Sequence, residues 1–168
     1  MNGKAEISRD AFVFLSIGIL LASGVTGCQS LGQRDMGRLV PDFYRVTIPS
    51  EGTSSHTFKT NDMTVNYQCR RAGDYLKIWG SGDIRFESIN ELIFHLYFLD
   101  QRGEVIAIHN FYSYLDHSDF IELTLEKRQI HRDFTIPPGA VAFAIGYDGE
   151  TGRMPGEDAV SFSHNPFH

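Results

Sequence analysis

The chain has 168 residues, a formal net charge of -6 at pH 7 and a sequence pI near 5.6. This length suits one ordinary domain with a hydrophobic core of its own. An acidic chain without basic runs lacks the electrostatic footprint of a nucleic-acid-binding protein, so we expect no nucleic-acid partner.

The chain begins with a pattern typical of a signal peptide. Lys4 and Arg9 lie in the first ten residues, and residues 11–25 contain no charged side chain. This apolar run is shorter than the roughly 20 residues that cross a hydrocarbon core. We therefore expect a cleaved leader rather than a permanent transmembrane helix.

The apolar run ends in Val25-Thr26-Gly27-Cys28. This motif resembles the lipobox of bacterial lipoproteins. The resemblance implies cleavage after Gly27, a diacylglycerol on Cys28 Sγ and acylation of the new amino group, and two or more acyl chains give stable membrane anchoring. Gln29 follows where the family's inner-membrane retention signal has aspartate, which implies an outer membrane location facing the periplasm in an organism with two membranes. The alternative is an ordinary secretory leader in which Cys28 has no special role.

The expected domain organisation follows from the leader. Residues 1–27 are the signal peptide, and residues 28–40 are the lipidated cysteine and a flexible tether, because residues 30–39 are polar and contain two glycines. Residues 41–168 are the folded domain.

Alternation of apolar and polar residues dominates the rest of the chain and predicts β-strands. Eight or nine short strands separated by turn residues indicate an all-β fold, a single antiparallel β-sandwich. Gly80-Ser81-Gly82 is expected to form a bulge or bend in one strand, and residues 121–125 form either a strand or a short helix that begins at Ser118. The other expected strands cover residues 44–48, 63–69, 75–86, 92–111 as a hairpin, 130–136, 141–147 and 160–162.

Two turns are well marked. Asp100-Gln101-Arg102-Gly103 divides the hairpin, with glycine at a left-handed position. Both faces of this hairpin are apolar, which predicts a central place in a sheet covered on each side or by a partner on one. Pro137-Pro138-Gly139 suits a type II turn.

The hairpin also carries a resemblance to a known family. Phe94-His95-Leu96-Tyr97, then Phe98-Leu99-Asp100 and Gly103, with a later Pro-Pro-Gly turn, is similar to the immunoglobulin-like FxLYD-type domains of secreted and lipid-anchored bacterial proteins. The resemblance covers residues 75–147 and implies an immunoglobulin-like sandwich. It implies no activity, because that family is not defined by one.

The cysteines and histidines predict no chemistry. If Cys28 is lipidated, Cys69 has no disulfide partner, and its place in an alternating apolar strand predicts that it points into the core. If Leu99 pairs with Glu104, His95 and His109 lie on opposite faces of the hairpin. No pair of histidines has metal-ligand spacing, so we expect neither a metal site nor a cofactor.

One stretch is a candidate ligand site. Tyr112, Tyr114, Asp116 and His117 place aromatic rings at a strand end, followed by polar turn residues, which suits a sugar or another polar ligand. Asp116 with Asp119 could also hold calcium. The alternative is that the aromatic residues anchor the strand end and the polar residues solvate a turn.

These observations predict a lipid-anchored cell-envelope protein whose sandwich binds without catalysis, as an accessory subunit of a membrane-associated assembly. The alternative is a carbohydrate or cell-wall glycan binding module that uses Tyr112 and Tyr114, with Trp79 as a further aromatic candidate. A third hypothesis is an enzyme whose site is assembled from distant strands. The sequence contains no catalytic motif, and no residue is assigned a catalytic role.

Overall fold

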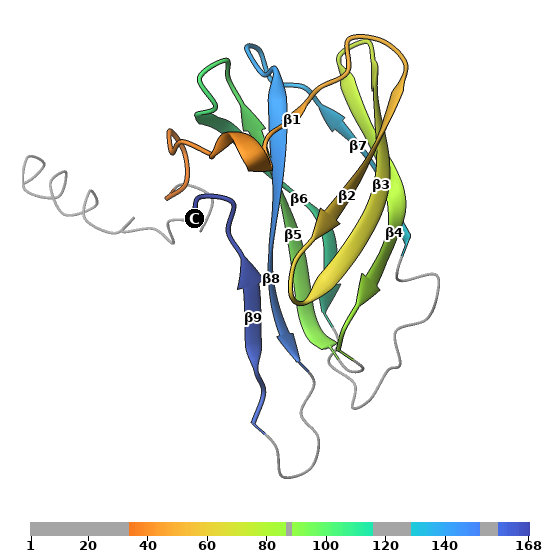
Figure 1. The fold of residues 1–168 in the computed structure, drawn as a ribbon, viewed down its shortest axis with the longest axis vertical. Helices are drawn as coiled ribbons and strands as arrows, with labels where there is room; N and C mark the ends of the chain where they lie inside the picture. Colours follow the sequence, from red (N-terminus) through yellow and green to blue (C-terminus); the bar gives the residue numbers. More distant parts are fainter. Residues whose placement is uncertain (1–33, 87–88, 116–128, 152–157) are drawn as a thin grey trace, which may run out of the picture.

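The computed structural model of the protein describes residues 34–86, 89–115, 129–151 and 158–168 (Figure 1). This part of the chain contains nine strands and one turn of 3-10 helix, η3 (Asp42–Tyr44). The strands are β1 (Val46–Thr47), β2 (Thr53–Lys59), β3 (Met63–Ala72), β4 (Tyr75–Ile84), β5 (Ile89–Leu99), β6 (Val105–Leu115), β7 (Gln129–Thr135), β8 (Ala142–Thr151) and β9 (Ser161–His164).

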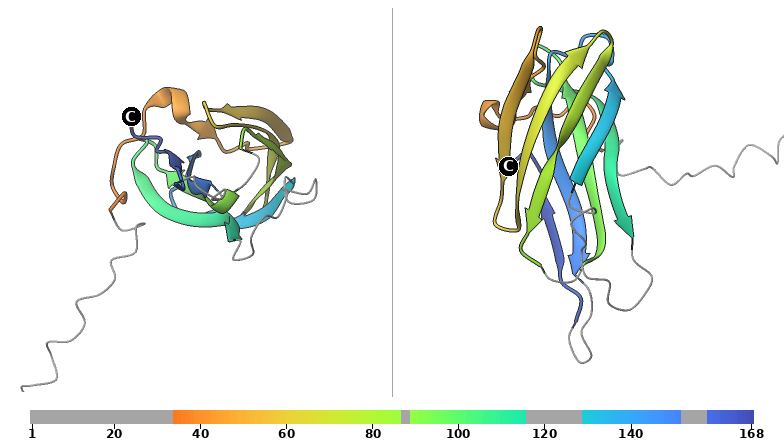
Figure 2. Two further views of the ribbon diagram at one scale, coloured as in Figure 1. Left: turned by 90° about the horizontal axis from the view of Figure 1, so that it is seen from below. Right: turned by 90° about the vertical axis from the view of Figure 1, so that its right-hand side faces the viewer.

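The strands form two antiparallel sheets that pack face to face (Figure 2). The five-stranded sheet has the order β1-β8-β5-β6, with β9 also paired to β8, and the four-stranded sheet has the order β2-β3-β4-β7. The predicted antiparallel β-sandwich is confirmed.

The main core lies between the sheets and is built by alternation. On β3, Met63, Val65, Tyr67 and Cys69 are all buried, and the residues between them are not. The same rule places Leu76 and Ile78 of β4 in the core, because successive side chains of a strand point to opposite faces. The five-stranded sheet contributes the facing buried side chains, which are Leu92, Phe94, Leu96 and Phe98 of β5 and Phe143, Ile145 and Tyr147 of β8.

A second apolar cluster covers the outer face of the five-stranded sheet. Val40 is completely buried against Tyr97 and Leu99, and its backbone N–H donates to the Gly103 carbonyl at 3.0 Å. The C-terminal Phe167 packs beside the same cluster. This cover explains why both faces of β5 are apolar, and it shows that residues 37–40, expected at the end of the tether, contact the sheet.

Both marked turns form as predicted. Gly103 has φ 86°, and Asp100 Oδ1 accepts the backbone N–H groups of Arg102 and Glu104 at 2.9 Å. Gly139 has φ 87°, and the N–H of Ala140 donates to the Pro137 carbonyl, which fits a type II turn.

Three details differ from the sequence-based expectation. β4 pairs with β3 in a continuous register through Gly80, so the prediction of a bulge there is wrong. The irregularities lie instead in β5, which pairs Leu99 with Val105 rather than with Glu104. Strand β2 was not expected, because its inward residues are only half-buried and include Ser54 and His56.

Candidate functional site

The outer face of the four-stranded sheet, which points away from the core, carries polar side chains around one aromatic residue. Gln68 of β3, Trp79 of β4 and His131 of β7 lie directly opposite one another across the three strands. A cavity of about 1130 Å³ lies over this row.

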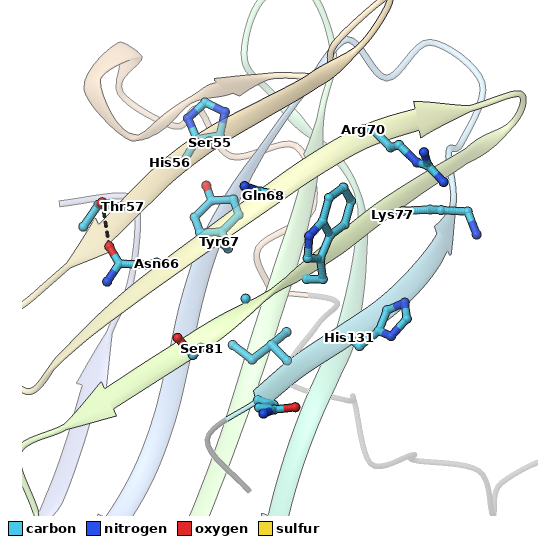
Figure 3. A pocket seen from close by; sticks show the side chains of 14 residues that line it. Ser55, His56, Thr57, Asn66, Tyr67, Gln68, Arg70, Lys77, Ser81 and His131 are labelled. Carbon is cyan, nitrogen blue, oxygen red and sulfur yellow. Dashed lines mark hydrogen bonds between the residues drawn. The ribbon is translucent and has the colours of Figure 1, made fainter. Parts of the chain in front are cut away.

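Two further cross-strand rows flank the first. On one side, Asn66, Ser81 and Gln129 are register partners, and on the other side Arg70, Lys77 and Asp133 are. Figure 3 shows Arg70, Lys77 and His131 toward the same end of the cavity. We call this surface the Trp79 face, made up of Ser55, Thr57, Asn66, Gln68, Arg70, Lys77, Trp79, Ser81, Gln129 and His131.

Alternation along the strands explains the composition of the Trp79 face. Leu76 and Ile78 point into the core, so Lys77 and Trp79 must point outward. The indole of Trp79 is consequently only half-buried. An indole held at a solvated surface offers an apolar ring face and one N–H donor to a ligand.

The hydrogen-bonding groups on this face are only partly satisfied. Thr57 Oγ1 donates to Asn66 Oδ1 at 2.9 Å, which fixes that amide (Figure 3). The side-chain amides of Gln68 and Gln129 have no hydrogen-bond partner among the described residues. Each amide therefore remains able to donate and to accept a hydrogen bond.

The charges on the face are positive in excess. Lys77 Nζ lies 2.7 Å from Asp133 Oδ2, so that pair is close to neutral. The Arg70 guanidinium lies 6.0 Å from the centroid of the Trp79 ring, and no carboxylate of the described chain forms an ion pair with it. Arg70 is thus a cation beside an aromatic ring, with its hydrogen-bonding fork open to solvent.

Cys69 lies on the opposite, inner side of the same sheet. Its Sγ is 3.2 Å from Ser54 Oγ, which is 3.0 Å from His56 Nε2. Cys69 has no exposed surface, and burial raises the pKa of its thiol, an effect that the Ser54 hydrogen bond partly offsets. Because the thiolate is the nucleophilic form, burial disfavours a nucleophilic role for this thiol. The predicted core position of Cys69 is confirmed.

His95 and His109 do not share a site. His95 lies on the outer face of the five-stranded sheet, with Nδ1 2.8 Å from Asn110 Oδ1 and Nε2 3.0 Å from Asp148 Oδ2. His109 packs on the inner side against Phe98. The predicted opposite orientation is correct, although the expected register is not. Across the described ranges, no group of three or more His, Cys, Asp or Glu side chains could hold a metal ion.

The candidate site around Tyr112 is only partly covered by the structure. Tyr112 and Tyr114 lie in β6, with their backbones opposite Phe94 and Leu92. Asp116, His117, Asp119, residues 121–125 and Cys28 lie outside the described residues. The site that the structure does assemble is the Trp79 face, whose amides and basic side chains were not recognised from the sequence.

The chain matches no protein-family model, no curated protein and no solved structure. In the described part of the chain, no helix is long and apolar enough to cross a bilayer.

Proposed function

We propose that this protein is a lipid-anchored protein of the cell envelope whose β-sandwich acts by binding, and that the Trp79 face is its ligand site. The single observation that carries the binding role is the cavity over Trp79, which is lined by side chains from all four strands of one sheet. Pockets of several hundred Å³ or more, with a few convergent polar groups, are the usual form of ligand sites.

The groups on this face suit recognition rather than covalent chemistry. Amides, hydroxyls and a guanidinium supply hydrogen bonds and charge, and the indole supplies a stacking surface. The described cysteine lies on the other side of the sheet, out of reach of a ligand in the cavity. Binding without catalysis accounts for this composition.

Of the two partner classes expected from the sequence, a glycan is the one that the Trp79 face supports better. Sugar rings present an apolar C–H face and a rim of hydroxyls, and the Trp79 indole beside the amides of Gln68 and Asn66 complements both. A protein interface would be expected to have a more apolar centre and several aromatic anchors. Among the residues that make up the Trp79 face, Trp79 is the one Phe, Trp or Tyr side chain, and it is half-buried.

The binding proposal is tested by co-sedimentation of the full-length protein, in mild detergent, with insoluble cell-envelope glycan. We expect the Trp79→Ala variant to lose at least about tenfold in apparent affinity, as for an aromatic hot spot. Phe43→Ala is the matched control, because Phe43 is 75% exposed and lies in η3, away from this face. Equal sedimentation of the wild type and the Trp79→Ala variant would exclude the Trp79 face as the site.

The anchoring proposal rests on the lipobox resemblance and is tested separately. Cys28→Ala should abolish acyl labelling, leave the leader uncleaved by the lipoprotein peptidase and change the membrane fractionation of the protein. Unchanged labelling and processing in that variant would show that the leader is not of the lipoprotein type.

A second candidate function, an accessory subunit of a membrane-associated assembly, is favoured by strand β2. Among the described strands, β2 pairs only with β3, so its other edge is open to a partner strand. Capture of the natively lipidated protein from gentle detergent extracts tests this role. A stoichiometric protein that co-purifies equally with the wild type and with Trp79→Ala would favour the subunit over the glycan binder.

A further inference from the structure

We infer that the ligand of the Trp79 face is an acidic glycan, a chain of pyranose units that bear carboxylates, in which one ring stacks on Trp79 and its carboxylate meets Arg70. This inference rests on the proposed binding function and names the ligand class for the same site. It is carried by the position of Arg70 beside the Trp79 ring, 6.0 Å from its centroid. The other polar groups of the face are amides, hydroxyls, the His131 imidazole and Lys77, which is paired with Asp133.

The size of the cavity indicates an oligosaccharide rather than a single sugar. Pockets for drug-sized ligands occupy about 300 to 1,000 Å³, and the cavity over Trp79 has a volume of about 1130 Å³. Its lining comes from β2, β3, β4 and β7, so a ligand lying across the strands contacts side chains from each of them. An extended chain of several rings fits this shape.

The hydrogen-bonding groups match the rim of a sugar chain. Asn66, Gln68 and Gln129 each carry an amide that can donate and accept, and Ser55 and Ser81 add hydroxyls. Sugar hydroxyls likewise donate and accept, so each pairing satisfies both partners. Asn66 is already fixed by Thr57, which reduces the conformational freedom lost on binding.

The charge on the face selects an acidic ligand. No residue that lines the cavity is acidic, although the chain contains 21 Asp and Glu residues. Lys77 is neutralised by Asp133, which leaves Arg70 as the open permanent cation. A guanidinium binds a carboxylate through two parallel hydrogen bonds, a geometry that a lysine cannot reproduce.

The net charge of the protein does not oppose this assignment at short range. Charges more than about 8 to 10 Å apart are largely screened at physiological ionic strength. The electrostatic energy of a carboxylate in contact with Arg70 therefore depends on the side chains of the cavity rather than on the overall charge of -6. The local excess of positive charge decides the preference.

The experiment uses the fact that the chain contains one tryptophan, so that its fluorescence reports directly on Trp79. Short oligouronates are titrated into the full-length protein, and the fully methyl-esterified oligomers serve as neutral controls with the same rings and linkages. We expect both forms to change the emission and the acidic form to bind about fivefold more tightly, the upper end for an exposed ion pair. This preference should shrink in high salt.

Arg70→Gln should remove the preference for the acidic form, so that the acid and the methyl ester bind this variant with equal affinity. Arg71→Gln is the matched control, because Arg71 is the next residue on β3 and its Nε donates to the Gly73 carbonyl away from the cavity. The Arg71→Gln variant should retain the full preference.

The outcomes that contradict the acidic glycan differ from those that contradict the proposed binding function. Equal binding of acid and ester by the wild type would overturn the acidic glycan, and an acid preference that survives in Arg70→Gln would overturn the contact of its carboxylate with Arg70. If Trp79-dependent sedimentation with envelope glycan persists in that case, the proposed binding function stands. An oligoglutamate that binds through Arg70 as tightly as the oligouronate would overturn the assignment to a glycan, because the site would then recognise carboxylates without sugar rings.

Discussion

The hydroxyl of Tyr147, on β8 of the five-stranded sheet, donates a hydrogen bond of 2.7 Å to Asp62 Oδ2, in the turn between β2 and β3 of the other sheet. Thr60 Oγ1 lies 2.8 Å from the same hydroxyl and also accepts the backbone N–H groups of Asp62 and Met63 at 3.2 Å. Since the Tyr147 proton goes to Asp62, Thr60 donates to Tyr147. Burial raises the pKa of Tyr147, so it remains a donor across the physiological range.

The first prediction concerns this link between the sheets. Tyr147→Phe should lower the free energy of unfolding by about 1.5–3 kcal/mol, the range for a hydrogen bond to a charged group. Tyr75→Phe is the control, because Tyr75 is 51% exposed and should change stability by less than about 0.5 kcal/mol. Denaturant unfolding measures both. A Tyr147→Phe variant as stable as the wild type would mean that the link contributes nothing.

The second prediction concerns pH. Burial lowers the pKa of both His56 and His164 below the usual 6.5, and for His164 the Asp62 carboxylate opposes that shift. The unfolded chain therefore binds protons more readily at these two positions. Their contribution to stability is complete above pH 6.5 and is lost as the pH falls through the lower pKa values of the folded state.

The measurement is thermal unfolding between pH 7.5 and 5. The double variant His56→Gln, His164→Gln should lose less stability over this interval than the wild type does. The comparison cancels the contributions of the carboxylates, which both proteins share. If the stability of the two proteins changed equally with pH, His56 and His164 would not be the source of this pH dependence.

The third prediction concerns Gly80, in the middle of β4. A Cβ at this position would meet the carbonyl oxygen of Asn66 and would lie 2.6 Å from Tyr67 Cα, both backbone atoms of β3. Gly80→Ala should therefore destabilise the fold by about 1–3 kcal/mol through strain. Ser81→Ala, at the next and exposed position, should be nearly neutral, and an equally neutral Gly80→Ala would show that the two strands can separate without cost.

The fourth prediction tests whether the chain before Pro41 belongs to the folded unit. Val40→Ala should lower the free energy of unfolding by about 1–3 kcal/mol, because it removes two buried methyl groups. Leu39→Ala is the control, since Leu39 is adjacent but 59% exposed. If the two substitutions had equal, small effects, the segment would contribute little to the stability of the domain.

The strands with strong alternation could be predicted from the sequence, and those without it could not. Strand β5 carries a run of large apolar residues, and strand β8 alternates Phe143, Ile145 and Tyr147 with small residues. Glycine marks the β5–β6 turn. Strand β2 lacks this signal, because Phe58 is the one large apolar residue on its inward side. Its position depends on pairing with β3, a long-range contact that local sequence does not encode.

The candidate site could be predicted only in part, for a related reason. Alternation in β4 alone places Trp79 outside with Lys77, so its exposure can be read from the sequence. The neighbours of Trp79 come from β3 and β7, and β7 begins 50 positions later at Gln129. A single bulge shifts which residues of two paired strands face each other, as the pairing of β5 with β6 shows. Gly80 illustrates the same limit, because a glycine can mark a bulge or a close approach of two strands.

The position of the chain ends has a consequence for the reach of the domain. Arg38 lies 4.0 Å over the ring of Phe167, so the segment nearest the proposed anchor and the C-terminal segment meet on the outer face of the five-stranded sheet (Figure 1). The Trp79 face belongs to the other sheet and is free of both. An extended chain from Cys28 to Gly37 spans at most about 30 Å. If Cys28 is lipidated, the domain can therefore contact only ligands close to the bilayer. Its effective concentration for glycan near the membrane is then raised, and more distant glycan lies out of its reach.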